Sequence, residues 1–174
     1  MGEVIRGGVD DSDTLMRLLR LPPAALGLLK EVARHLLRRP VVGFALAARV
    51  PDGRWVLIRR GDTGTWAPVG GTLEWGETFR DAIPRELLEE AGTSLRSIGR
   101  LVGVFSRPDR DLRFHAVTVV VACEVDLPSR PPANMLEIEE VGLFTDAELP
   151  TDLAMGTGDM LDAARRDAEE PILE

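Results

Sequence analysis

The pattern of hydrophobic and polar residues follows a helical period near the beginning of this chain. In residues 23–38, leucine and alanine recur every three or four positions, and basic side chains occupy the opposite face. This spacing predicts an amphipathic helix that begins near Pro23 and ends at Pro40. We expect its apolar stripe to pack on the rest of the chain or on a second copy of the protein. Binding to a membrane surface is the less favoured alternative.

From residue 41 onward the pattern predicts strands. Residues 41–50 are apolar, the sequence Pro-Asp-Gly at 51–53 signals a turn, and 55–58 form a second apolar run. A β-hairpin is therefore expected there. Three further strands are expected, at residues 97–105, 115–125 and 138–144.

Helices are expected between and after these strands. One covers residues 78–91 and stops at Gly92, because glycine commonly ends a helix. Another begins at Thr157. Helices and strands around one sheet indicate an α/β or α+β domain with helices on both faces of the sheet. We therefore expect an N-terminal helical extension at 1–40 and one domain at 41–174.

Composition narrows the class of protein. The 174 residues carry 29 acidic and 21 basic side chains, so the net charge is −8. An acidic surface without a basic tract repels nucleic-acid phosphates, and no nucleic-acid partner is expected. Cys123 is the only cysteine, which favours a reducing, cytoplasmic compartment. No apolar run is long enough to span a bilayer and no secretory leader is evident, so no membrane association is expected.

Candidate chemistry is concentrated in residues 71–93. On a helix, Glu86, Glu89 and Glu90 project from one face, because they are spaced three and four residues apart. The glycine pair at 70–71 lets the backbone approach a ligand closely. A carboxylate cluster on a rigid helix suits Mg²⁺, which takes oxygen ligands and keeps waters and phosphate oxygens around it. The segment has no histidine or cysteine, so zinc and copper fit poorly.

The same segment resembles the Nudix box, G-x5-E-x7-R-E-U-x-E-E-x-G-U, in which U is a bulky aliphatic residue. The fixed positions in register are Gly71, Glu77, Arg85, Glu86, Glu89, Glu90 and Gly92. For this composition, a chance match is on the order of one in a hundred thousand. Thr93 replaces the last aliphatic residue, and Val69 separates Pro68 from the glycine pair. Pro84 lies inside the expected helix and is predicted to bend it.

The resemblance implies a Nudix-like α/β/α sandwich with a mixed β-sheet. It also implies catalytic Mg²⁺, with Mn²⁺ as a substitute. The implied metal ligands are Glu86, Glu89, Glu90 and the backbone carbonyl of Gly70. Arg85 is implied to be one of the catalytic residues. It would pair with Glu77 and hold the helix against the preceding loop. Arg60 is implied to contact a substrate phosphate.

The implied reaction is attack of a metal-activated water on one phosphorus of a nucleoside diphosphate linked to another group, X. The products are a nucleoside monophosphate and phosphorylated X. Nucleoside triphosphates, ADP-ribose and dinucleotide polyphosphates all stay open as substrates, and a homodimer is compatible with the sequence. A box glutamate or one of three later acidic residues would accept the proton. These later candidates are Glu137, Glu139 and Glu140.

Two alternatives belong to other functional classes. One is a nucleotide-sensing domain without hydrolysis, against which the intact box carboxylates count. The other is a diphosphate-ester isomerase that uses a cysteine, for which Cys123 is the sole support; its apolar strand favours an inert thiol. Trp66 and Trp75 are candidates for stacking on a base, with core or loop packing at least as well supported. His115, at a strand edge, is expected to have no special role.

Overall fold

The computed structural model describes residues 27, 28, 30–33, 39–111, 113–154, 156–166, 168 and 170–174. The chain divides into two units, Met1–Arg39 and Pro40–Glu174. In the first unit, residues 27, 28 and 30–33 are helical. The remainder of the predicted helix at 23–38 lies outside the described residues. The assignment of domains at 1–40 and 41–174 and the packing of that helix stay predictions.

The second unit is built on one mixed sheet. Its strands are β1 (Val41–Arg49), β2 (Trp55–Arg60), β3 (Trp66–Pro68), β4 (Gly70–Thr72), β5 (Leu95–Phe105), β6 (Ala116–Val125), β7 (Ile138–Phe144) and β8 (Ile172–Leu173). Within the described residues the main strand order is β3-β2-β1-β6-β5-β8, with β4 beside β1 and β7 beside β2. The pairs β1–β6 and β5–β8 are parallel, whereas β1–β2 and β5–β6 are antiparallel. The predicted mixed sheet is confirmed.

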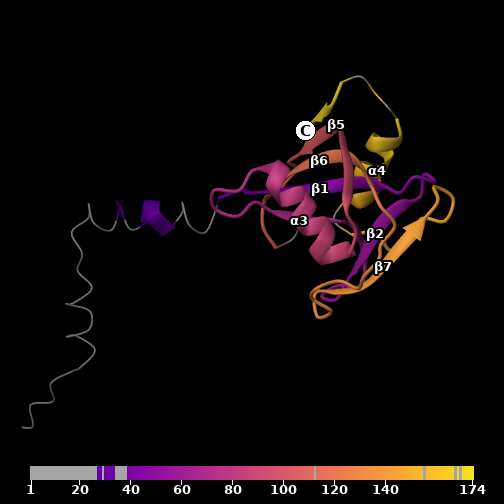
Figure 1. Ribbon diagram of the computed structural model, residues 1–174. Helices are drawn as coiled ribbons and strands as arrows, with labels where there is room; N and C mark the ends of the chain where they lie inside the picture. The colour runs from indigo at the N-terminus through magenta and orange to yellow at the C-terminus, as the bar shows by residue number, and fades with distance from the viewer. Residues whose placement is uncertain are drawn as a thin grey trace, which may run out of the picture. The chain divides into compact units, whose positions relative to one another are not determined.

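The helices cover the two faces of this sheet (Figure 1). They are α3 (Phe79–Ala91) and α4 (Thr157–Arg165). Along β1, Phe44, Leu46 and Ala48 belong to the apolar cluster that includes residues of α3. Ala45 and Ala47 belong to the cluster that includes residues of α4. Because side chains alternate across a strand, the two helices lie on opposite faces, and the predicted sandwich is confirmed.

Helix α3 begins and ends close to the predicted positions. Thr78 is its N-cap, and the Thr78 N–H donates to the Asp81 carboxylate at 3.2 Å. This bond satisfies one of the backbone groups that a helix start leaves unpaired. Gly92 ends the helix with φ 59°, a left-handed conformation that favours glycine. Pro84 therefore lies inside the helix and not in its first turn; the bend at this proline stays a prediction.

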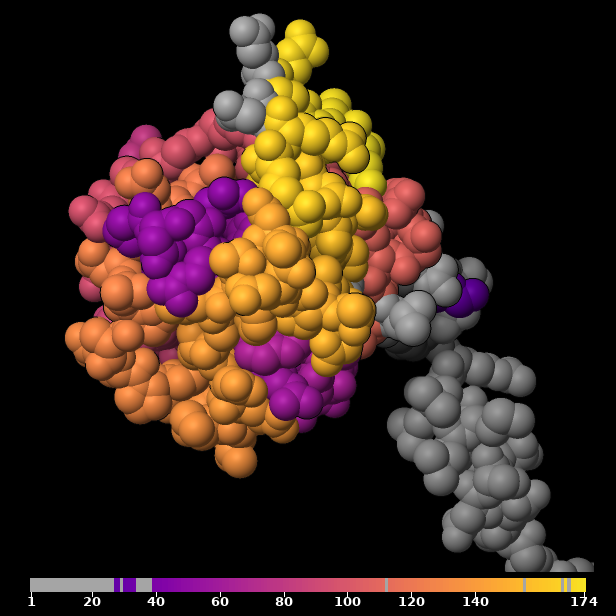
Figure 2. Space-filling view, turned by 90° about the vertical axis from the view of Figure 1, so that its right-hand side faces the viewer, coloured from indigo at the N-terminus to yellow at the C-terminus, as the bar shows by residue number. Residues whose placement is uncertain are grey.

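The C-terminal part of the chain returns to the sheet after α4. Figure 2 shows this part, in yellow, gathered over one region of the surface. Strand β8 pairs with β5, Gly103 opposite Ile172 and Val104 opposite Leu173. The last described residues therefore lie beside the start of the β5–β6 connection. In the described part of the chain, no helix is long and apolar enough to cross a membrane.

Candidate functional site

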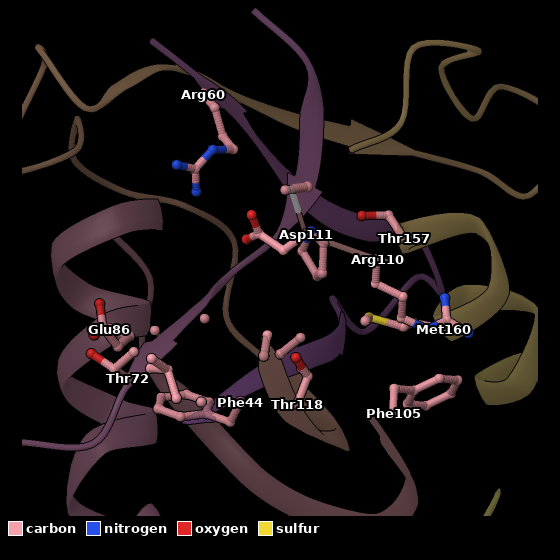
Figure 3. Close-up of a pocket in the computed structure, with 18 of the residues that line it drawn as sticks. Phe44, Arg60, Thr72, Glu86, Phe105, Arg110, Asp111, Thr118, Thr157 and Met160 are labelled. Atoms are coloured by element: carbon pink, nitrogen blue, oxygen red, sulfur yellow. The ribbon is translucent and has the colours of Figure 1, made fainter. Parts of the chain in front are cut away.

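A cavity of about 370 Å³ lies between α3, β1, β4 and the β5–β6 connection (Figure 3). Its polar lining includes Arg60, Thr72, Glu86, Glu90, Arg110, Asp111, Arg113, Thr118, Glu137 and Thr157. Four residues predicted for the site, Arg60, Gly70, Glu86 and Glu90, therefore line one cavity. The sequence places them in three separate segments, so their convergence is a property of the fold.

The glycine pair allows β4 to lie directly against the face of α3 that carries Glu86 and Glu90. A β-carbon on Gly71 would overlap the Glu86 carboxylate, and one on Gly70 would overlap the Phe44 carbonyl oxygen. The Gly70 N–H donates to Glu90 Oε2 at 3.0 Å. Position 70 therefore requires glycine, because the overlap there is with backbone, whereas a side chain at position 71 would displace the Glu86 carboxylate. A role for the Gly70 carbonyl as a metal ligand stays a prediction.

Burial makes the two cavity carboxylates on α3 difficult to ionise. It raises the pKa of Glu90 to about 8, and the nearby charges of Glu86 and Glu137 act in the same direction, against the Gly70 N–H. Burial likewise raises the pKa of Glu86, although the adjacent Arg85 opposes this shift. Buried carboxylates that repel one another are stabilised by a bound cation, so this wall is suited to one.

Arg85 holds the start of the box against the helix, as the resemblance implied. Its Nε and Nη2 donate to the two carboxylate oxygens of Glu77 at 2.8 and 2.9 Å. Its Nη1 donates to Glu86 at 3.0 Å and to Glu89 at 3.3 Å. A two-pronged contact of this kind fixes geometry as well as charge. Arg85 therefore orients Glu86 and does not itself line the cavity.

Glu89 stands apart from the other two box glutamates. Its side chain is 51% exposed, contacts Arg85 and does not line the cavity. Across the residues that the structure describes, no group of three or more His, Cys, Asp or Glu side chains is arranged to hold a metal. Ligation by Glu89 stays a prediction, and it requires a rearrangement of the Glu89 side chain.

Of the three later acidic candidates, the structure brings one into the cavity. Glu137, just before β7, lines it. Glu139 and Glu140 lie 3.9 and 3.8 Å from the guanidinium of Arg59 and do not line the cavity. The Glu137 carbonyl accepts the Gly61 N–H at 2.7 Å, which ties this segment to the end of β2. Glu86, Glu90 and Glu137 thus face the same space.

The wall opposite α3 consists of paired charges. Arg60 donates through Nε and Nη2 to Asp62 at 2.9 and 2.7 Å. Asp62 also accepts from Arg113 Nη1 at 3.3 Å, and Arg113 donates to both oxygens of Asp111 at 3.0 and 2.8 Å. The neighbouring arginines hold the pKa values of Asp62 and Asp111 below their ordinary range. Arg60 therefore reaches the cavity in a fixed orientation.

Sequence reasoning missed the contribution of the β5–β6 connection. Arg110 and Phe114 from this connection line the cavity, together with Asp111 and Arg113. The available signal was the density of arginine and aspartate at residues 107–113, which the pattern identified only as a loop. Figure 3 shows Arg110 on the side of the cavity away from Glu86, with Asp111 between them.

The other candidates from the sequence lie away from the cavity. Trp66 is 9% exposed and packs edge-on against Phe144, so it belongs to the core. Trp75 is fully exposed and does not line the cavity. Cys123 is buried outside the cavity, and burial raises the pKa of its thiol to about 12. An inert thiol results, so Cys123 lends no support to the isomerase alternative.

The donor set fits a hard divalent cation. Glu86, Glu90 and Glu137 offer carboxylate oxygens within one cavity, and the described lining contains no histidine or cysteine. Mg²⁺ needs one or two protein carboxylates and completes its shell with water and phosphate oxygens. The residues present therefore suit Mg²⁺ or Mn²⁺ better than zinc or copper.

Comparison with known proteins finds curated relatives that each match a part of this chain. Over 77 residues the chain is 39% identical to an ADP-ribose pyrophosphatase of Methanocaldococcus jannaschii, covering 42% of this chain and 45% of that protein. Over 73 residues it is 38% identical to a MutT-like protein of Streptomyces ambofaciens, covering 42% and 44%. The aligned part thus spans less than half the length of these curated relatives.

A solved structure extends the likeness over most of the fold. The crystal structure of a MutT NUDIX hydrolase from Burkholderia pseudomallei matches with a TM-score of 0.63 and 29% identity, covering 72% of this chain and 98% of that one. The family model of the NUDIX domain matches residues 38–165, well over half of the chain. The fold, the carboxylates of α3 beside the glycine pair, and this match together show that the chain belongs to the NUDIX domain family.

Proposed function

We propose that the protein is a divalent-metal-dependent pyrophosphohydrolase. It cleaves a nucleoside diphosphate linked to another group, X, into a nucleoside monophosphate and phosphorylated X. The observation that carries this proposal is the placement of Glu86 and Glu90 in one cavity with Arg60. The buried carboxylates suit a cation, and the guanidinium suits a substrate phosphate.

Two carboxylates of the cavity would hold the cation, and these are Glu86 and Glu90. When bound, Mg²⁺ or Mn²⁺ lowers the pKa of a ligated water and neutralises charge on the phosphoryl oxygens. Arg85 keeps Glu86 in place through its own pairing with Glu77. Glu89 would become a metal ligand only if its contact with Arg85 breaks.

The remaining steps depend on side chains around the diphosphate. Arg60, oriented by Asp62, binds a phosphate oxygen and aligns the bond to be cleaved. Glu137 accepts the proton of the attacking water, since it lines the cavity while the other two later glutamates face Arg59. Phe114 offers a partly exposed ring in the cavity for the nucleoside or for X.

The charges in the cavity favour a diphosphate with an uncharged X over longer phosphate chains. Each arginine in the described lining already faces a carboxylate. These pairs are Arg60 with Asp62, Arg113 with Asp111, and Arg110 with Glu174. Little spare positive charge is left for a third or fourth phosphate. ADP-ribose, the substrate named for the M. jannaschii relative, is therefore the first compound to test.

The test is hydrolysis of ADP-ribose, ATP and diadenosine tetraphosphate with Mg²⁺, with Mn²⁺ and with EDTA. Products are identified by mass spectrometry in ¹⁸O-labelled water, which shows the phosphorus that was attacked. We expect AMP and ribose 5-phosphate from ADP-ribose, faster than any product from ATP, and none with EDTA. No turnover of any compound with either metal would contradict the proposal.

A non-hydrolytic nucleotide sensor is the second candidate. The observation that favours it is the engagement of Glu89 with Arg85, which leaves the described box glutamates short of a ready-made metal trio. Calorimetry distinguishes the two, because a sensor binds ADP-ribose without consuming it. The cytoplasmic location and the homodimer expected from the sequence stay predictions; light scattering would test the latter.

A further inference from the structure

The β5–β6 connection, residues 106–115, forms much of the cavity wall away from α3. It contributes Arg110, Asp111 and Phe114 to the lining. Apart from residue 112, which is not described, it contains no helix or strand. A wall without its own ladder of backbone hydrogen bonds depends on contacts from elsewhere for its shape.

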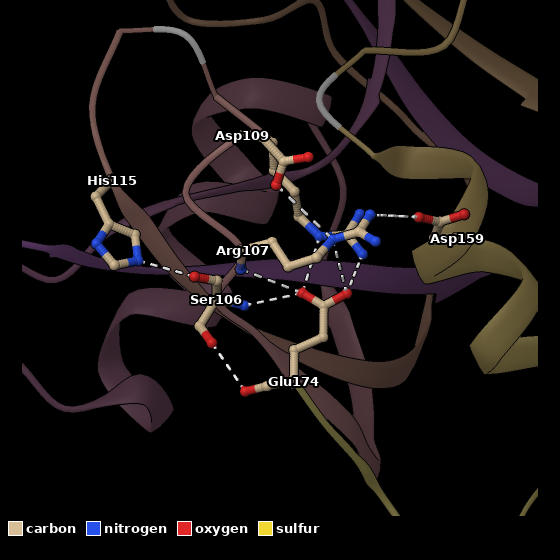
Figure 4. A network of polar contacts seen from close by, with 7 residues as sticks. Ser106, Arg107, Asp109, His115, Asp159 and Glu174 are labelled. Carbon is tan, nitrogen blue, oxygen red and sulfur yellow. Dashed lines mark hydrogen bonds and ion pairs between the residues drawn. The ribbon is translucent and has the colours of Figure 1, made fainter.

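Several of those contacts come from Glu174, which follows β8 (Figure 4). The Glu174 N–H donates to the Val104 carbonyl at 3.0 Å, extending the pairing of β8 with β5. Its carboxylate accepts the N–H groups of Ser106 and Arg107 at 3.1 and 3.3 Å. Its main-chain oxygen accepts the Ser106 hydroxyl at 2.9 Å. One residue thus caps the beginning of the connection.

The same carboxylate also holds the arginine that reaches the cavity. Arg110 donates to Glu174 through Nε at 3.0 Å and through Nη2, while its Nη1 donates to Asp159 of α4 at 3.0 Å. The side chains of Arg110 and Glu174 are 8% and 17% exposed. Charges buried to this extent are weakly screened by salt, so the pair is a firm one. These contacts hold the pKa of Glu174 near 2.

Arg110 also packs tightly against the start of α4. A β-carbon on Gly156 would overlap its Nη1, so the guanidinium lies directly on the backbone there. Thr157, the first residue of α4, lines the cavity beside it. The guanidinium therefore joins three parts of the fold, namely the connection, α4 and the segment after β8.

We propose that Glu174 is a positioning residue, which sets the cavity wall formed by Arg110, Asp111 and Phe114 for the part of the substrate remote from the bond that breaks. The inference rests on the proposed function. Glu86, Glu90 and Arg60 have no contact with Glu174, so the chemical step does not depend on it. We call the contacts of Glu174 with Ser106, Arg107 and Arg110 the clasp. Its loss lowers substrate affinity and leaves the rate of the chemical step unchanged.

Glu174→Gln tests this assignment. It keeps the size of the side chain but removes the charge and places an amide N–H₂ against the donors of Ser106, Arg107 and Arg110. We expect KM for ADP-ribose to rise about tenfold while kcat stays within about twofold. Glu170→Gln, an exposed carboxylate in the preceding segment, is the matched control and should change neither. A lower melting temperature for Glu174→Gln with an unchanged KM would mean a purely structural staple and would overturn the proposal.

A double-mutant cycle shows whether Glu174 acts through Arg110. If it does, the variant with both Glu174→Gln and Arg110→Gln has the KM of the worse single variant; additive effects on KM would overturn that route. Hydrogen exchange of the 106–114 amides needs no turnover, and it should quicken in Glu174→Gln. Exchange unchanged from wild type overturns the clasp, whereas a wild-type protein that hydrolyses nothing overturns the proposed function alone.

Discussion

The two walls of the cavity use carboxylates in opposite ways. On α3, burial raises the pKa values of Glu86 and Glu90, the latter to about 8. On the opposite wall, hydrogen bonds from arginine lower the pKa of Asp111, and they do the same for Glu174, which lies behind that wall and holds Arg110. Buried carboxylates whose pKa is raised would be stabilised by a cation, whereas carboxylates paired with arginine fix the shape of the protein. Pairing, and not the number of acidic residues, separates ligand sites from framework in this molecule.

The largest expected effect comes from removing charge on the α3 wall. Glu90→Gln should reduce kcat for ADP-ribose at least about 100-fold, because a cation held there stabilises charge in the transition state. The fold should persist, with a slightly higher melting temperature in EDTA at neutral pH, because a carboxylate that is ionised in the unfolded chain no longer has to be neutralised when it is buried. Glu139→Gln, which lies beside Arg59 outside the cavity, is the control. Turnover of Glu90→Gln near the wild-type value would remove Glu90 from the assigned site.

A smaller loss is expected from the phosphate contact. Arg60→Gln should lower kcat/KM about tenfold, because an amide replaces a charged fork that binds phosphate oxygens. The neighbouring Arg59→Gln serves as the control, since Arg59 faces Glu139 and Glu140 and does not line the cavity. Steady-state kinetics of both variants decides the matter. Equal losses in the two would show that Arg60 has no specific role.

The two walls should also respond oppositely to pH. Glu90 has a folded pKa of about 8, above its ordinary 4.5, so it favours the folded state at low pH and this contribution is lost as pH rises toward 8. Glu174 has a folded pKa of about 2, so its contribution is lost only as pH falls from 4.5 toward 2. We expect the melting temperature in EDTA to fall between about pH 5 and about pH 8. The fall should be smaller in Glu90→Gln; an equal fall would contradict the origin assigned to it.

The smallest expected effect concerns Pro84, which touches no ligand. Proline inside a helix loses one backbone hydrogen bond and crowds the carbonyl four residues earlier, here that of Arg80, at a cost of up to about 3 kcal/mol. Pro84→Ala should therefore raise stability and shift Mg²⁺ affinity about threefold, through straightening of the turn before Glu86. Calorimetric titration with Mg²⁺ measures this, with the exposed Arg80→Ala as control. A straight α3 in an experimental structure of the wild type would contradict the predicted bend.

Prediction from sequence succeeded where the relevant residues are close together in the chain. Glu86 and Glu90 were found because a helix brings positions four apart to one face, and Gly92 because a helix end needs a left-handed residue. Strands β3, β4 and β8 were not predicted, since two or three residues are too few to show alternation. The sequence left the choice among Glu137, Glu139 and Glu140 open, because it depends on the residue at which β7 begins and on the contact with Gly61.

By itself, the sequence determined the periodicity of the main elements, the box helix and the glycine pair, since these follow from local backbone geometry and side-chain spacing. The tertiary structure alone decided which charges meet. Glu174 and Arg110 are far apart in the chain, and only the parallel pairing of β8 with β5 brings them together. Burial, too, is a property of the packed fold, and burial is what separates the pKa of Glu90 from that of Glu174.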